Sequence, residues 1–295
     1  MACPGTYCGR VRLDDGILGE CGACPRGQTV GNESICFDCN KELTTYDWLY
    51  LGTIVLSTIV VHVLGLRAAA SKVTQTKLFL VLSLVSATLE SLLSAIIALL
   101  LFDPVGKLNL RSCGVNRLSD WYTIFLNPRP RYTETIHCAQ EAVYPLYTLV
   151  FAYYGLALVT LLLFRPIFTW KFRRYKSCRV PVYFEMYSIP VLVIVHAGLA
   201  GLLYFAFPYL TLLGTTFWTV HFMNSRRIEG LKQLFTNSGN VCMILLHCCM
   251  YCYGIGTCLV SSEQPAPFLA FLLLAPVPAA FYLLTSPFTD PVHYV

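Results

Sequence analysis

Cysteine is the residue type with the most evident chemical potential in this sequence. Six of the 14 cysteines lie in the first 39 residues, and four of them form two CxxC pairs, Cys21/Cys24 and Cys36/Cys39, separated by eleven residues. Such pairs are typical of a zinc ribbon, in which four thiolates hold one metal ion. They are equally typical of a disulfide knot in a segment too short to form a core. The spacing leaves both interpretations open, and the compartment decides between them.

A carboxylate and several histidines in apolar segments form a second candidate site. Glu90 lies near the middle of an apolar run, where an ionisable group is costly enough to suggest a function. The histidines within or at the ends of such runs are His62, His196, His221 and His247. Glu90 with one or two of them would form a proton relay or a metal site. We favour a simpler interpretation, a protonated Glu90 hydrogen-bonded across a helix interface.

The composition indicates that a membrane protein carries these residues. Of the 295 residues, 56% are hydrophobic and 13% are charged, and the mean hydropathy is +0.60. A soluble domain needs far fewer apolar residues for one core. We identify seven apolar runs: Trp48–Leu66, Leu78–Phe102, Val143–Phe164, Val182–Phe207, Tyr209–Met223, Val241–Val260 and Phe268–Thr285. About 20 apolar residues cross a bilayer as a helix, so the predicted fold is an all-α polytopic membrane protein with seven transmembrane helices.

The distribution of Lys and Arg assigns a side of the membrane to each loop. The predicted cytoplasmic loops are Arg67–Lys77, Arg165–Arg179 and Asn224–Ser238. They hold twelve Lys and Arg against one acid, Glu229, and short loops rich in these cations remain in the cytoplasm. Six of the twelve lie in one stretch and are candidates for contacts with cytoplasmic partners: Arg165, Lys171, Arg173, Arg174, Lys176 and Arg179. Seven spans then place the N-terminus in the lumen or outside the cell and the C-terminus in the cytoplasm.

This topology favours disulfides over zinc, because disulfides persist in oxidising compartments. The candidate cysteines are Cys3, Cys8, Cys21, Cys24, Cys36, Cys39, Cys113 and Cys138. We expect three disulfides among the six N-terminal cysteines and a fourth between Cys113 and Cys138, although the pairing among the six is not derivable from spacing. Asn32-Glu33-Ser34 is a glycosylation sequon that is usable on the lumenal side.

The predicted domain organisation has three parts. Residues 1–46 form a small disulfide-rich lumenal cap, 47–285 a seven-helix bundle, and 286–295 a short cytoplasmic tail. Within the bundle, we expect a lumenal loop at 103–142 and a basic cytoplasmic loop at 165–181. We expect Trp121 in the lumenal loop to anchor at the lipid headgroups, with binding of misfolded client proteins as the alternative.

Several sequence blocks taken in order resemble the c-Jun N-terminal kinase-associated membrane protein family. They are GECGACPRGQ, YDWLYLG, DPVG, RSC, LSDWYT and HC-x2-EAVYPLYTLVF, and the strong resemblance covers roughly residues 3–165. It implies a seven-span protein of the endoplasmic reticulum membrane with no enzymatic activity or cofactor of its own. By resemblance, its partners are the proteasome, a membrane RING ubiquitin ligase and c-Jun N-terminal kinase. The implied roles are degradation of misfolded proteins, the unfolded protein response and stress-kinase signalling.

Two classes of function are the main alternatives, and a third, a ligand-activated receptor, would require an open pocket under the Cys-rich cap. The first is the adaptor implied by the resemblance, in the endoplasmic reticulum membrane or alternatively the plasma membrane. The second is an ion or small-molecule transporter using Glu90 and the intramembrane histidines, which a hydrated cavity reaching Glu90 would favour. A nucleic-acid partner is disfavoured, because the cations lie in short loops rather than on one basic face. Arg173-Arg174 followed by Val180-x-Val182 also fits a loose kinase-docking pattern, although contact of these cations with anionic lipid is the simpler interpretation.

Overall fold

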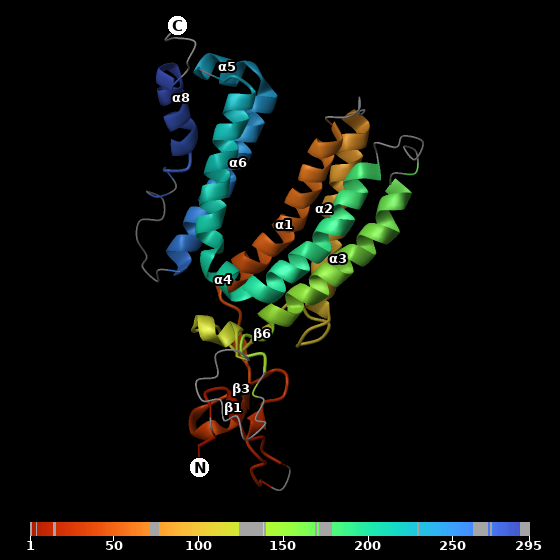
Figure 1. The fold of residues 1–295 in the computed structure, drawn as a ribbon, viewed down its shortest axis with the longest axis vertical. Coiled ribbons are helices and arrows are strands. Elements are labelled where there is room, and N and C mark those ends of the chain that lie inside the picture. The colour runs from red at the N-terminus through yellow and green to blue at the C-terminus, as the bar shows by residue number, and fades with distance from the viewer. Residues whose placement is uncertain are drawn as a thin grey trace. The chain divides into compact units, whose positions relative to one another are not determined.

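The computed structural model describes residues 2–3, 5–13, 16–70, 77–123, 138, 140–168, 170, 179–228, 230–261, 271 and 273–289. The chain divides into two compact units, Met1–Tyr204 and Phe205–Val295. Their helices and some of their strands are labelled in Figure 1. Each unit is described by itself below.

The cap is built from short antiparallel strand pairs. β1 (Cys8–Gly9) pairs with β2 (Gly22–Ala23), and β3 (Gln28–Val30) pairs with β4 (Cys36–Asp38). β5 (Lys41–Glu42) pairs with β6 (Arg111–Ser112), a strand of the 103–142 loop. Two 3-10 turns complete this region, η1 (Asn32–Ser34) in the cap and η2 (Leu118–Trp121) in the loop. Strand pairs this short are not stable alone in water, so other interactions must hold the cap together.

Disulfides supply that stabilisation, and two of them differ from the expected pairing. The four bridges are Cys3–Cys21, Cys8–Cys138, Cys24–Cys36 and Cys39–Cys113. The predicted Cys113–Cys138 bridge is therefore wrong, because each of these cysteines pairs with a cysteine of the cap. The two bridges between cap and loop span 130 and 74 residues. Loops of this length correspond to about 4–5 kcal/mol per bridge in the chain-entropy model.

Hydrogen bonds explain why the loop pairs with the cap rather than with itself. The Cys24 amide donates to Gln140 Oε1 at 2.7 Å, and the Tyr7 hydroxyl donates to Asp120 Oδ1 at 3.0 Å. Burial raises the pKa of the Tyr7 hydroxyl, so the hydroxyl remains a donor at neutral pH. These contacts, with the β5–β6 pair, bring Cys138 and Cys113 beside their cap partners. The cap and the 103–142 loop are thus one covalently closed structure.

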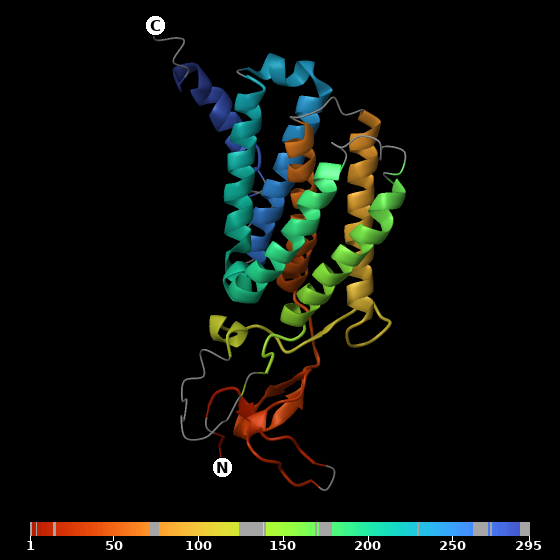
Figure 2. The same cartoon turned by 45° about the vertical axis from the view of Figure 1, so that its right-hand side comes forward.

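Three helices and the first part of a fourth form the bundle of the first unit. They are α1 (Thr45–Ala70), α2 (Lys77–Leu100), α3 (Leu146–Phe168) and α4 (Val180–Ser225). In both views α1, α2 and α3 lie side by side (Figure 2). A capping box starts α1: the Thr44 amide donates to Asp47 Oδ2 at 2.9 Å, and the Asp47 amide donates to Thr44 Oγ1 at 3.2 Å. The Tyr204 hydroxyl donates to the same carboxylate at 2.7 Å, which links α4 to the start of α1.

In its described residues, the second unit contains the rest of α4 and three further helices. These are α5 (Leu231–Thr236), α6 (Ser238–Ser261) and α8 (Val277–Thr289). Its buried core consists of Phe222, Met223, Ile228, Leu234, Ile244 and Ala279. The last helix continues to Thr289, beyond the predicted end of the final span at Thr285.

Among the described residues, five helices are long and apolar enough to cross a membrane. The segments are Thr45–Arg67, Leu78–Leu100, Leu146–Ile167, Val180–Ser225 and Ser238–Val260, with a shorter apolar helix at Val277–Ser286. At about 1.5 Å per residue, the 46 residues of α4 exceed twice a hydrocarbon core of about 30 Å. α4 contains both the predicted fourth and fifth runs. The seven expected spans therefore agree approximately with the five long helices and the shorter one. The chain is an all-α polytopic membrane protein with a small disulfide-rich cap.

Trp121 packs into the bundle instead of facing the headgroups or a client protein. Its side chain is only 7% exposed, and its ring lies 5.2 Å from the Tyr204 ring and 6.1 Å from the Tyr50 ring, measured between centroids. A Cβ at Gly201 would lie 2.7 Å from the Trp121 Cβ. Gly201 therefore allows the 103–142 loop to close on α4, and the predicted headgroup anchor is wrong for Trp121.

We expect Gly201→Ala to lower the free energy of unfolding by about 1–3 kcal/mol, because the new methyl group must displace Trp121. The matched control is Gly198→Ala, where a Cβ meets no atom within 4 Å. This control should leave stability unchanged or slightly raised, since alanine is the better helix former. Thermal unfolding of the purified protein in detergent measures both. Equal midpoints for the two variants would contradict the proposed close packing.

The bridge between cap and loop predicts a specific free thiol. In Cys39→Ser, we expect Cys113 to become alkylated under denaturing, non-reducing conditions while Cys138 remains protected by Cys8. In the matched Cys36→Ser variant, Cys24 should be the residue released. Peptide mapping by mass spectrometry identifies the labelled cysteine. A protected Cys113 in Cys39→Ser would contradict the pairing.

Candidate functional site

Arg165 is a completely buried cation inside the helix bundle. It lies in the last turn of α3, and 0% of its surface is exposed. This corrects the prediction that Arg165 begins the basic cytoplasmic loop and contacts cytoplasmic partners, because α3 continues to Phe168. A buried guanidinium needs compensating charge, and two neighbouring helices supply it.

Glu90 from α2 is the first carboxylate on Arg165. The Arg165 Nη2 donates to Glu90 Oε2 at 2.7 Å and Nε donates to Oε1 at 3.1 Å. The Ser86 hydroxyl, one helical turn earlier, also donates to Oε1. This bidentate geometry is that of an ionised carboxylate on a guanidinium. The protonated Glu90 expected from the sequence is therefore replaced by a buried ion pair.

Glu185 from α4 is the second carboxylate and was missed in the sequence analysis. Its Oε2 lies 3.1 Å from Arg165 Nη2 and 2.7 Å from His62 Nδ1 on α1. Arg165 Nη1 lies 3.0 Å from the same His62 nitrogen. The signal was present, since Glu185 is an acid within the apolar run Val182–Phe207. We call Arg165, Glu90, Glu185 and His62 the four-helix charge network, because each comes from a different helix.

The four-helix charge network has two alternative proton arrangements. Arg165 is a donor only, so His62 Nδ1 accepts from it when Nδ1 carries no proton. When Nδ1 is protonated, it donates to Glu185 instead. Two carboxylates and one guanidinium leave one negative charge, which a second proton on His62 would neutralise. The Ser83 hydroxyl, 3.3 Å from His62 Nε2, can accept or donate in either arrangement.

The network is closed to solvent in this conformation. Glu90 and Glu185 are each 4% exposed, and His62 is 0% exposed. A cavity of about 180 Å³ lies between α1, α2 and α3, with mainly apolar lining that includes Trp48, Leu99 and Tyr153. None of the four charged residues lines it. In the described part of the chain, no group of three or more His, Cys, Asp or Glu could hold a metal ion.

The other predicted polar residues lie outside this network. His196 is in α4, where its Nε2 donates to the Tyr147 carbonyl at 3.1 Å and its ring stacks on Tyr147. His247 belongs to the second unit, and its ring lies 5.7 Å from that of Phe222. Of the predicted intramembrane residues, the structure thus brings together only Glu90 and His62.

Most of the predicted cytoplasmic contact residues lie outside the described residues. These are Lys171, Arg173, Arg174 and Lys176. Arg179 is described and is exposed just before α4 begins. Asn32 belongs to η1, but its side chain is outside the described part of the structure, so its glycosylation remains a prediction.

Arg165→Met should lower the free energy of unfolding by about 3–5 kcal/mol, because it leaves two buried carboxylates without their cation. Replacing Glu90 and Glu185 by Gln in the same chain should recover part of the loss by removing the uncompensated charge. Arg179→Met is the matched control on an exposed cation. Thermal unfolding in detergent compares the variants. Equal stability of Arg165→Met and Arg179→Met would contradict the ion-pair network.

Comparison with known proteins gives matches along nearly the whole chain. The model of the family described as JNK1/MAPK8-associated membrane protein matches residues 3–291. The chain is 39% identical over 303 residues to the Homo sapiens JNK1/MAPK8-associated membrane protein, covering 98% of this chain and 94% of the relative. Identity to the Mus musculus protein of that name is 38% over 301 residues, with the same coverage. The Caenorhabditis elegans homolog is 29% identical over 281 residues, covering 93% and 85%.

No solved structure gives a significant match. The family predicted from the sequence blocks is confirmed by the family model, and the similarity extends through the later helices as well as the first 165 residues. The chain therefore belongs to the JNK1/MAPK8-associated membrane protein family.

Proposed function

We propose that this chain is a non-enzymatic adaptor of the endoplasmic reticulum membrane that associates with c-Jun N-terminal kinase. The observation that carries this proposal is the similarity along 98% of the chain to relatives named for their association with JNK1/MAPK8. The finer role is recruitment of proteasomes and a membrane RING ubiquitin ligase for degradation of misfolded proteins. In this role the helix bundle acts as a scaffold that holds docking segments at the membrane.

The proposed topology places the cap in the lumen and the C-terminus in the cytoplasm. The four disulfides support it, because disulfides form in oxidising compartments. The excess of Lys and Arg in the predicted cytoplasmic loops supports it independently. A glycan on Asn32 would report the lumenal cap directly, as a mobility shift that is absent in Asn32→Gln.

The geometry of the four-helix charge network supports a scaffold over a transporter. A transported ion needs charged groups that water can reach and that exchange partners during transport. Here Arg165 is bonded to both Glu90 and Glu185, and both acids are almost fully buried. We propose that the network joins the helices, so that its charge serves the packing of the bundle.

We propose that the cytoplasmic contacts come from the basic segment without Arg165. The remaining cations are Lys171, Arg173, Arg174, Lys176 and Arg179. An acidic docking groove on a kinase is the surface that such cations would fit, because opposite charges accelerate and orient association. Membrane lipid is a second contact of the same cations.

Reversing the charge at Arg173 and Arg174 to Glu should reduce recovery of c-Jun N-terminal kinase several-fold in proximity labelling from the cytoplasmic side. The loss follows from repulsion between the new acids and an acidic groove. Charge reversal at Arg226 and Arg227, in another predicted cytoplasmic loop, is the matched control. Asn32 glycosylation checks that neither variant has inverted in the membrane.

Unchanged kinase recovery from the Arg173 and Arg174 variant, with topology intact, would overturn docking through this segment. The broader adaptor proposal has its own criterion in the unmodified protein. Proximity labelling without kinase, proteasome or ubiquitin-ligase peptides would overturn it.

A further inference from the structure

The Cys3–Cys21 disulfide differs from the other three bridges in its surroundings. Seven of the eight bridged cysteines are buried, and Cys21 alone among them is partly exposed. Its partner Cys3 is only 8% exposed. One bridge of the cap therefore combines a partly exposed cysteine with a buried one.

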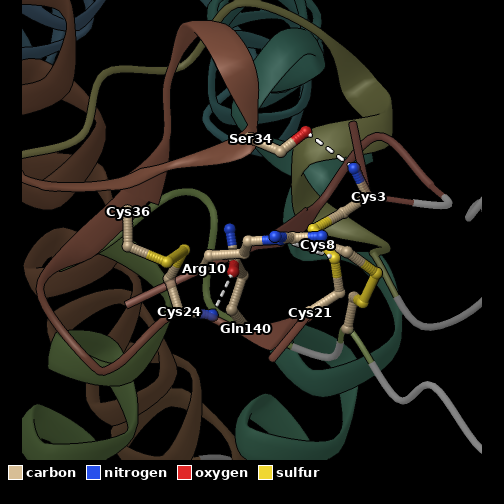
Figure 3. Close-up of a disulfide and its surroundings, with 9 residues drawn as sticks. Cys3, Cys8, Arg10, Cys21, Cys24, Ser34, Cys36 and Gln140 are labelled. Atoms are coloured by element: carbon tan, nitrogen blue, oxygen red, sulfur yellow. Dashed lines mark hydrogen bonds between the residues drawn. A yellow bond between two sulfur atoms is a disulfide. The ribbon is translucent and has the colours of Figure 1, made fainter. Parts of the chain in front are cut away.

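A cation also lies against the sulfur of Cys21. Arg10 Nε donates to Cys21 Sγ at 3.3 Å, and Figure 3 shows the Arg10 side chain extending alongside the bridges. If the bridge is reduced, Cys21 becomes a thiolate, and a neighbouring guanidinium stabilises that negative charge. Stabilising the reduced form makes a disulfide easier to reduce, as in oxidoreductases whose reactive thiolate is held by its surroundings.

The backbone holds Arg10 and Cys3 in place independently of the bridge. The Arg10 amide donates to the Ser34 carbonyl at 2.8 Å, and the Cys36 amide donates to the Arg10 carbonyl at 3.0 Å. The Cys3 amide donates to Ser34 Oγ at 3.0 Å. The backbones of Arg10 and Cys3 are thus both fixed to Ser34, which keeps them close after reduction. A reduced pair held in this way can close again by exchange with a disulfide, which takes up the two electrons.

We propose that the Cys3–Cys21 bridge is a thiol–disulfide exchange site whose substrates are thiols. Cys21 is the exchanging cysteine, because it is the partly exposed member of the pair and Arg10 would stabilise its thiolate. Cys3, which is buried and adjacent, is the leaving cysteine when a thiol attacks, and the resolving cysteine when the reaction runs in reverse. The CxxC spacing of Cys21 and Cys24 does not define this pair, because Cys24 is bridged to Cys36.

The exchange proceeds in two balanced steps. The thiolate of an incoming thiol attacks Cys21 Sγ and forms a mixed disulfide, while the Cys3–Cys21 bond breaks and its electron pair leaves on Cys3, which takes a proton from solvent. A second thiolate attacks the substrate sulfur of the mixed disulfide and expels Cys21 as a thiolate beside Arg10. In total, two substrate thiols are oxidised to one disulfide, and the Cys3–Cys21 bridge gains the two electrons. Of the two protons that the substrate thiols release, one is balanced by the proton that Cys3 takes up. The other stays in solvent or protonates Cys21.

The first experiment equilibrates the purified full chain in detergent with graded ratios of reduced to oxidised glutathione. The thiols are then alkylated and identified by peptide mapping. We expect Cys3 and Cys21 to become labelled at ratios that leave the other six bridged cysteines paired. Reduction of all four bridges at the same ratio, or of another bridge first, would overturn the proposal.

Variants of Arg10 test the role of the cation. We expect the bridge of Arg10→Met to open only at a glutathione ratio about tenfold more reducing than in the unmodified protein, as loss of a hydrogen bond to a charged group implies. Arg10→Lys keeps the positive charge, so we expect a smaller change in this ratio. The matched control Arg12→Met, on an exposed cation of the cap, should leave the ratio unchanged. An intact Cys39–Cys113 bridge before titration verifies that each variant is folded. An unchanged ratio in Arg10→Met would overturn the proposal.

Single cysteine variants identify the exchanging sulfur and its substrate. With oxidised glutathione, Cys3→Ser should accumulate a glutathione adduct on Cys21, because the free Cys21 thiolate attacks the glutathione disulfide and releases one reduced glutathione. Cys21→Ser should form at least several-fold less adduct on the buried Cys3. Ribonuclease A scrambled to non-native disulfides supplies protein disulfides in a parallel arm. An adduct on Cys21 in both arms assigns protein thiols as substrates, and an adduct with glutathione alone assigns small thiols. Preferential modification of Cys3 in Cys21→Ser would overturn the assignment.

Discussion

The buried guanidinium of Arg165 is the constraint on which the helix bundle depends. A permanent positive charge in the interior is tolerated only with compensating charge and complete hydrogen bonding. Glu90 on α2 and Glu185 on α4 supply the compensating charge, and His62 on α1 also contacts the guanidinium. Four helices must therefore adopt one relative register, because only that register brings the opposite charges together. Apolar packing alone specifies such a register weakly in a membrane, where lipid is as apolar as the helix faces.

The cap is held by a different physical principle, covalent closure of long loops. Its strands are too short to form a core, so the two bridges to the 103–142 loop provide most of the constraint on the unfolded chain. Trp121 then connects this closed structure to the bundle through its contacts with Tyr50, Tyr147 and Tyr204. Charge pairing within the helices and disulfides outside them thus stabilise the two parts of the first unit.

These two devices suit a protein that presents segments at a membrane. The charges of the bundle are used in packing, and in the proposed function the cations of the connecting segments, among them the exposed Arg179, contact partners and lipid. The cap is cross-linked by disulfides, and Cys21 differs from the other bridged cysteines because it is partly exposed and its sulfur lies beside Arg10. In the proposed topology, the redox-responsive bridge of the cap lies on the lumenal side of the membrane. The docking segments lie on the cytoplasmic side, so the two would act in different compartments.

Sequence alone determined the class of fold and the family, because apolar runs of membrane-spanning length and the order of the sequence blocks are local properties. It also identified Glu90, His62 and the eight bridged cysteines as chemically important. Only the tertiary structure decided their partners, since ion pairs and disulfides join residues far apart in the chain. It moved Arg165 from a predicted loop into the bundle, added Glu185, and paired Cys8 and Cys39 with the 103–142 loop. Hydropathy and charge counts describe each segment by itself, whereas a buried charge takes its role from the helices that pack around it.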